Sequence, residues 1–239
     1  MQWAALGLFS LRSIAAVAFP LAWLAAPAPV LALNAYITDG GDNTVSVIDT
    51  STNTVVATVA VGANPRGVAV SPDGTKVYVA NFGDNTVSVI GTITNTVMAT
   101  IPVGERPTGV AVSPDGSKVY VANSDTPGSS PWSLSVIDTA TKAVSAVPLP
   151  PPAGQSQGVA VTPDGKWVYV TGGAATVAII KTATNAGSTV SIPTAAGLLN
   201  GVAVTPNGKS VYVADLLNNR VSVIDTIEQF AIRHHLRPF

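Results

Sequence analysis

The sequence lacks cysteine entirely, and among its 239 residues it has two histidines and only 10% charged side chains. Without cysteine the chain can form no disulfide, no thiol nucleophile and no thiolate metal ligand. The histidines, His234 and His235, lie in an aberrant C-terminal tail, so a histidine-dependent triad in the rest of the chain is excluded and zinc would find only a fragment of a site. From these absences we expect no intrinsic catalysis, no metal and no cofactor.

The charge balance is nearly neutral, with a formal net charge of -1 and a pI near 6.0. No basic surface is available to neutralise phosphates, which argues against nucleic acid as a partner. The hydrophobic fraction of 47% excludes a disordered chain.

The first 33 residues carry one charge, Arg12, which is followed by an apolar run from Ile14 to Ala26. This run is too short to span a bilayer comfortably, and with its small-residue exit it is typical of a secretory signal peptide. We therefore expect a cleaved signal peptide over residues 1–32, no membrane span after cleavage, and a periplasmic, secreted or cell-surface protein. A retained membrane anchor is the alternative, because Trp3 to Leu11 is also mostly apolar.

An eight-residue segment recurs four times, running Gly-Val-Ala-Val, then Ser or Thr, Pro, Asp or Asn, and Gly. The copies start at Gly67, Gly109, Gly158 and Gly201, which are 42, 49 and 43 residues apart. Each copy is followed by blocks rich in valine, isoleucine, threonine and tyrosine with turn residues between them, which predicts four short strands per unit. Four antiparallel strands repeating at about 42 residues is the period of a β-propeller blade.

The repeat predicts an all-β propeller of about five blades over residues 33–225. The first unit offers three strands without the innermost one, three units are complete, and the last offers its first three strands. Residues 226–239 do not follow the repeat, and we expect residues 229–232 at most to patch the last blade's edge. This count predicts an open or truncated ring, with self-association through open blade edges.

The tyrosine-containing blocks resemble the YVTN-family β-propeller repeat. The residues that carry the resemblance are Tyr78-Val79-Ala80-Asn81, Tyr120-Val121-Ala122-Asn123 and Tyr169-Val170-Thr171-Gly172. The resemblance implies an exported or cell-surface protein, in a family with surface-layer components, a periplasmic DNA-binding member and relatives similar to quinoprotein dehydrogenase subunits and lactonases. We therefore expect a binding or structural module at the cell envelope, whose partner is an envelope protein or surface polymer. A quinoprotein-dehydrogenase-like or lactonase-like enzyme is the alternative.

Ligand contacts are expected in the loops that differ between units. The candidates in the loops that enter the inner strands are Arg66, Arg106, Gln157 and Asn200. Alignment on the repeat glycine places Arg66 with Gln157 and Asn200 but not with Arg106, so we expect no symmetric anion cradle. Plain solvation of these loops is the alternative.

Trp132 ends the longest insertion, residues 124–132, and is the fifth candidate ligand contact. An exposed tryptophan in a long loop favours recognition of a partner. The alternative is that this side chain folds back on its own blade.

The most regular polar residues have structural explanations. Aspartates of the Pro-Asp-Gly segments are expected to shape tight turns, and the aspartates and asparagines of other loops to cap turns in place of binding calcium. The repeat tyrosines, Tyr78, Tyr120, Tyr169 and Tyr212, are expected to pack between blades.

Overall fold

The structure is a computed structural model that describes residues 34–124, 132–150, 157–173, 175–193, 198–226 and 232–235. The chain divides into two compact units, Met1–Ala32 and Leu33–Phe239. The expected signal peptide, residues 1–32, lies outside the described residues. In the described part of the chain, no helix is long and apolar enough to cross a membrane.

The second unit consists of five antiparallel sheets, named here blades I to V in chain order. Blade I contains β1 (Asn34–Asp39), β2 (Thr44–Asp49) and β3 (Thr54–Ala60). Blade II contains β4 (Pro65–Val70), β5 (Lys76–Asn81), β6 (Thr86–Gly91) and β7 (Thr96–Pro102). Blade III contains β8 (Pro107–Val112), β9 (Lys118–Asn123), β10 (Ser133–Asp138) and β11 (Val144–Pro148). Blade IV contains β12 (Val159–Val161), β13 (Trp167–Gly172), β14 (Thr176–Lys181) and β15 (Ala186–Ser191). Blade V contains β16 (Leu199–Val204), β17 (Ser210–Asp215), β18 (Arg220–Asp225) and β19 (Ile232–His235).

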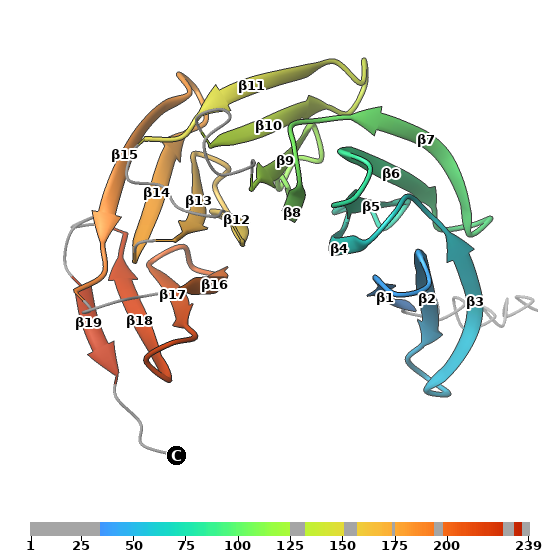
Figure 1. Cartoon of the computed structure of the whole chain (residues 1–239), viewed down its shortest axis with the longest axis horizontal. Helices are drawn as coiled ribbons and strands as arrows, with labels where there is room; N and C mark the ends of the chain where they lie inside the picture. Colours follow the sequence, from blue (N-terminus) through green and yellow to red (C-terminus); the bar gives the residue numbers. More distant parts are fainter. Residues whose placement is uncertain are drawn as a thin grey trace, which may run out of the picture. The chain divides into compact units, whose positions relative to one another are not determined.

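The blades follow one another in chain order around an open arc, which confirms the predicted open propeller of about five blades (Figure 1). The strands β4, β8, β12 and β16 line the inner side of this arc, and β7, β11 and β15 lie on its outer side. Neighbouring strands in each blade are also neighbours in sequence, because tight turns connect them.

The last blade differs from the expectation that it would be one strand short. Ile232–His235 forms β19 and pairs antiparallel with β18, with Ile224 opposite Ile232 and Val221 opposite His235. Strand pairing uses backbone groups that every residue carries, so a segment without the repeat pattern can complete the sheet. Blade I keeps three strands among the described residues, as expected.

The hydrophobic core consists of four clusters, each formed between one blade and the next. A tyrosine contributes to each cluster, and the four are Tyr36, Tyr78, Tyr120 and Tyr169. All four are buried, which confirms that the repeat tyrosines pack between blades. Tyr212 of blade V is the exception to that prediction, with 44% of its surface exposed. No further blade follows blade V in the described chain, so nothing there covers this side chain.

The glycines that open the repeats of blades II, III and IV lie against the backbone of the next blade. A Cβ atom added to Gly109 would lie 2.7 Å from the carbonyl oxygen of Gln157, and one added to Gly158 would lie 2.6 Å from that of Asn200. These contacts are with backbone atoms, which cannot rotate away. The repeat glycines of these three blades therefore have a steric reason in the contact between blades.

The Pro-Asp-Gly segments form the predicted turns. In blade II the Ser71 hydroxyl donates to the Asp73 carboxylate at 2.5 Å, and the Thr75 N–H donates to the same oxygen at 3.0 Å. Gly74 has a φ of 69°, in the left-handed region that glycine adopts without strain. The aspartate therefore holds its own turn, as the sequence predicts.

The hydrogen bonds of this turn lower the pKa of its aspartate. The pKa of Asp73 is lowered to about 2, first by the Ser71 hydroxyl and then by the Thr75 amide. The folded turn favours the ionised carboxylate of Asp73. The stabilisation that this carboxylate provides is therefore complete at a pH above the ordinary aspartate pKa of 3.8, and it is lost as the pH falls through about 2. A ¹³C NMR titration should show this midpoint in the wild type and a higher one in Ser71→Ala.

Asp49 provides an internal control for this titration. Its pKa is lowered by Ser51 in a different turn, so the Ser71→Ala change should leave the Asp49 midpoint where it is. An Asp73 midpoint that Ser71→Ala does not raise would contradict the assigned cause.

Candidate functional site

The loops that precede β4 and β8 are held by the same kind of hydrogen bond. The side-chain oxygen of Asn43 accepts the Asn64 N–H at 2.8 Å, and the side-chain oxygen of Asn85 accepts the Arg106 N–H at the same distance. Asn64 and Arg106 both have a φ of 50°. The asparagines that the sequence marks as turn caps therefore fix the backbone from which Arg106 extends.

Arg66 and Arg106 meet on the ring of Phe82. The Arg66 Cζ atom lies 3.5 Å from the ring centroid, and the Arg106 Cζ atom lies 5.6 Å from it. Arg66 is the second residue of β4, Phe82 follows β5, and Arg106 precedes β8. We call Arg66, Phe82 and Arg106 the arginine–phenylalanine cluster.

This cluster brings the two arginines together although they are not in register in the alignment of repeat units. The alignment compares positions within one repeat unit, and there the arginines differ by two residues. In the fold they belong to successive blades, and Phe82 from the intervening loop contacts both of them. Contacts across the boundary between two blades are invisible to an alignment of units.

The electrostatics of the cluster are unbalanced. The pKa of Arg66 is lowered by burial first and by the nearby charge of Arg106 second. Among the described residues, neither guanidinium forms an ion pair. Two positive charges are thus held together on an aromatic ring, where they repel each other.

A cavity of about 420 Å³ lies beside the cluster. Its lining residues are Phe82, Gly83, Asn85, Glu105 and Arg106. This lining combines an aromatic ring, a guanidinium group and a carboxylate. This arrangement can accept a group of modest size that carries an anionic end.

Phe82 was missed as a site residue by the sequence reasoning. The equivalent positions in the other units hold Gly40, Ser124, Gly173 and Leu216. Among the equivalent positions, only this one holds an aromatic residue. A structural role shared by all blades does not explain such a residue, so its single occurrence is a signal that could have identified Phe82.

Gln157 and Asn200 do not join the arginines. The Gln157 N–H donates to the Thr171 carbonyl at 3.1 Å, and the Asn200 carbonyl accepts the Thr171 hydroxyl at 2.8 Å. Both residues thus contribute backbone groups to the contacts around the inner strands. Of the five predicted ligand residues, Arg66 and Arg106 meet through their side chains on Phe82, whereas Gln157 and Asn200 meet through their backbones at Thr171.

Trp132 is half-buried and packs against the hydrophobic cluster between blades III and IV. Its carbonyl oxygen accepts the Leu149 N–H at 2.7 Å. This placement agrees with the alternative in which the side chain folds back on its own blade. Residues 125–131 of the insertion lie outside the described residues.

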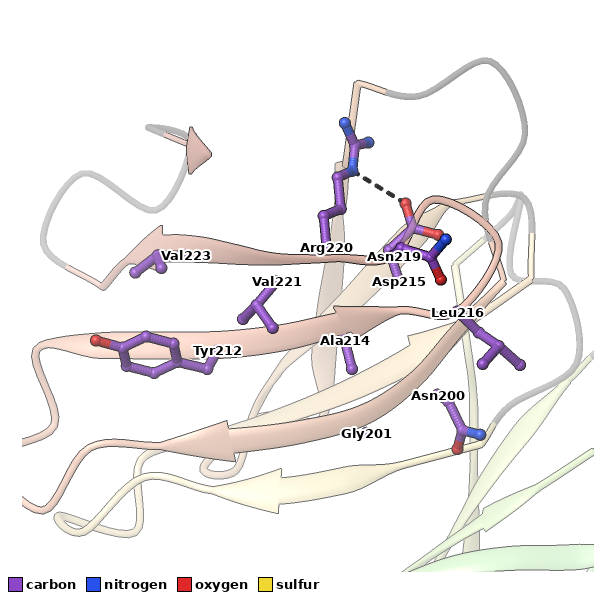
Figure 2. Close-up of a pocket in the computed structure, with 10 residues that line it drawn as sticks. All are labelled: Asn200, Gly201, Tyr212, Ala214, Asp215, Leu216, Asn219, Arg220, Val221 and Val223. Atoms are coloured by element: carbon purple, nitrogen blue, oxygen red, sulfur yellow. Dashed lines mark hydrogen bonds and ion pairs between the residues drawn. The ribbon is translucent and has the colours of Figure 1, made fainter. Parts of the chain in front are cut away.

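A second concave region covers one face of blade V (Figure 2). Its volume is about 890 Å³, and its apolar lining includes Tyr212, Ala214, Val221 and Val223. These four residues share one face of the sheet, because Tyr212 pairs with Val223 and Ala214 with Val221 across β17 and β18. We call them the open face.

The loop aspartates have different partners: one caps its own turn, Asp84 accepts the Ala63 N–H, and Asp215 pairs with Arg220. In blade I the Asp39 carboxylate accepts the N–H groups of Gly41 and Asp42 at 3.0 and 3.2 Å. No group of three or more histidine, aspartate or glutamate side chains within the described residues is arranged to hold a metal ion.

Comparison with solved structures identifies proteins of similar fold. The chain aligns with hydrazine synthase from Kuenenia stuttgartiensis at 25% identity and a TM-score of 0.53, covering 80% of this chain and 73% of that one. It aligns with virginiamycin B lyase from Staphylococcus aureus at 15% identity and a TM-score of 0.73, covering 87% of this chain and 68% of that one.

These structures correct the expectation of no catalysis. Both are enzymes, so the shared propeller architecture does not set this chain apart from catalytic proteins. A propeller can place different chemistry in its loops without changing its strands, and the absence of cysteine and of a histidine triad removes only some catalytic routes.

Among curated proteins, a segment of 39 residues is 59% identical to the PE-PGRS family protein PE_PGRS18 of Mycobacterium tuberculosis (strain ATCC 25618 / H37Rv). The match covers 16% of this chain and 8% of that protein, so the chain spans only a small part of this relative.

A family model described as a YNCE-like beta-propeller matches residues 4–126. This match supports the predicted propeller repeat, while the resemblance to YVTN proteins and the expected export stay predictions. Because it spans more than half of the 239 residues, this chain belongs to the YNCE-like beta-propeller family.

Proposed function

We propose that this chain is an exported binding module of the cell envelope that holds an anionic group of its partner between Arg66 and Arg106. The observation that carries the proposal is the position of both guanidinium groups on the Phe82 ring, without an ion-pair partner among the described residues.

The physical basis is the repulsion between the two arginines. Burial and the charge of Arg106 both lower the pKa of Arg66, so the charged state of the pair is less favourable than in water. An anion placed between the guanidinium groups relieves that repulsion and forms charge-assisted hydrogen bonds with both.

The guanidinium shape favours carboxylate or phosphate as the bound group. Its planar fork of N–H groups matches two oxygens of either anion. Stacking of Arg66 on Phe82 uses the face of the guanidinium and leaves its edge for this contact. An envelope polymer or protein that carries such groups is therefore the partner class that we propose.

Long-range attraction contributes little to this recognition. The formal net charge is -1, so the chain as a whole does not draw anions toward it. Affinity must come from the cluster itself, which makes the proposal sensitive to single substitutions.

Calorimetric titration tests the site with two probes, inorganic pyrophosphate and citrate, which separate phosphate from carboxylate recognition. We expect the wild type to bind at least one of them at low ionic strength. Arg66→Ala and Arg106→Ala should each weaken binding by about tenfold, which corresponds to the loss of one charge-assisted hydrogen bond. The same mixtures should be analysed for new products, since proteins of this fold include enzymes.

Lys209→Ala is the matched control, because this lysine is exposed in a turn of blade V and its removal changes the net charge equally. Its affinity for the probe should equal that of the wild type. Equal weakening by Lys209→Ala and Arg66→Ala would assign binding to net charge and overturn the site, as would a wild type that binds neither probe.

A further inference from the structure

The open face of blade V presents apolar side chains to solvent. Tyr212 is 44% exposed and Val221 is 41% exposed. Figure 2 shows both on the sheet that lines the hollow of about 890 Å³. A charged pair at one end of the hollow is already neutralised, because Arg220 Nε lies 3.2 Å from Asp215 Oδ2. The open face is therefore an apolar surface of the kind that is normally buried in a protein core, but here it is exposed to solvent.

The repeat shows what covers this face in the other blades. At the Tyr212 position, Tyr78, Tyr120 and Tyr169 are buried, and at the Val221 position Val87, Leu134 and Val177 are buried. In each case the next blade provides the cover, and the two faces form one hydrophobic cluster. Blade I contributes its tyrosine side to blade II in the same way, so this contact is built four times.

The covering surface is equally well defined. Its central residues come from the second and third strands of the next blade, for example Val121 and Ile137 in the cluster between blades II and III. The equivalent residues of blade I are Ile37 and Ile48. Ile37 is 54% exposed, while Val79, Val121, Val170 and Val213 at the same position are buried.

Blade I therefore carries a partly uncovered copy of the surface that the open face lacks. We call Ala35, Ile37 and Ile48 the counterpart face, and Ala35 corresponds to the buried Val77 of blade II. Ile37 is exposed, and Ala35 and Ile48 are half-buried, so the two halves of one repeated interface are both at least partly exposed, in blades V and I.

We propose that two copies of this chain associate head to tail, with the open face of one packed on the counterpart face of the other. The occupant of the open face is a second copy, because the chain itself carries the matching surface and uses that contact between its own blades. The interface joins two different surfaces, so each bound copy still offers one free face, and association continues beyond a dimer. This proposal is independent of the anion site.

Sedimentation velocity on protein purified from cells expressing the full-length chain tests this proposal. The weight-average mass of the wild type should rise with concentration beyond that of two chains by about 100 µM, a range suited to a modest interface. Val221→Arg places a charge on the open face and blocks its packing, and Ile37→Arg does the same on the counterpart face. Each variant alone should stay at the mass of one chain, and circular dichroism checks that each is folded.

Mixing the two variants gives the sharpest result. Ile37→Arg keeps a usable open face and Val221→Arg keeps a usable counterpart face, so an equimolar mixture should form a dimer and nothing larger. Ile93→Arg is the matched control, because Ile93 is 92% exposed in a turn of blade II and belongs to neither face. This variant should associate like the wild type.

Three outcomes would overturn the proposal. The first is a wild type that keeps the mass of one chain throughout. The second is association of Ile37→Arg or Val221→Arg to the same extent as the wild type, which would place the contact elsewhere. The third is an associating wild type whose two blocked variants do not combine on mixing, which would exclude the head-to-tail geometry.

Discussion

Tyr120→Ala is expected to lower the free energy of unfolding by about 3 to 5 kcal/mol, the cost of removing a buried aromatic side chain from a packed core. Tyr120 is 5% exposed and belongs to the cluster between blades III and IV, where it packs with Val168 and Val170. Removal of the ring leaves a cavity between two sheets whose backbones are held by their own hydrogen bonds. The neighbouring side chains can therefore fill the space only in part.

Tyr212→Ala provides the comparison at the same repeat position. We expect a loss of about 1 kcal/mol or less, because solvent already reaches this side chain. Urea unfolding followed by circular dichroism measures both variants, at concentrations well below those used for association so that a second copy does not cover Tyr212. Equal losses would mean that the cover provided by the next blade does not determine the stability of this position.

The second large effect is expected from Gly109→Ala. The added Cβ would lie 2.7 Å from the Gln157 carbonyl oxygen and 3.0 Å from the Val159 nitrogen, both in the backbone of blade IV. Blades III and IV would have to move apart to relieve this contact. Overpacking of this kind costs about 1 to 3 kcal/mol, and we expect a value at the upper end because backbone atoms must shift.

Gly201→Ala is the matched variant in blade V. There the nearest atom to an added Cβ is the Ala214 Cβ at 3.9 Å, an ordinary van der Waals distance. We expect a gain of about 0.4 to 1 kcal/mol, because alanine restricts the unfolded chain more than glycine. Thermal and urea unfolding of the two variants should thus differ in sign. A comparable loss in both would show that the strand backbone itself, and not the next blade, requires glycine.

The strands and turns could be predicted from the sequence because their causes are local. The Pro-Asp-Gly segments make the same turn wherever they occur, since the aspartate hydrogen bonds within two residues of itself. The repeat of valine-rich blocks then places the strands, and the regular tyrosines predict a core between blades.

The sequence by itself determined the propeller architecture, its number of blades and the residues that pack between them, because each unit repeats the same local pattern. Only the tertiary structure decided that Arg66 and Arg106 share Phe82, that Tyr212 is uncovered, and that Ile232–His235 completes blade V. These features depend on contacts between different units or on backbone pairing that requires no side-chain pattern. An alignment of units contains neither, because it compares residues that occupy the same place in different blades and never those that meet across a boundary.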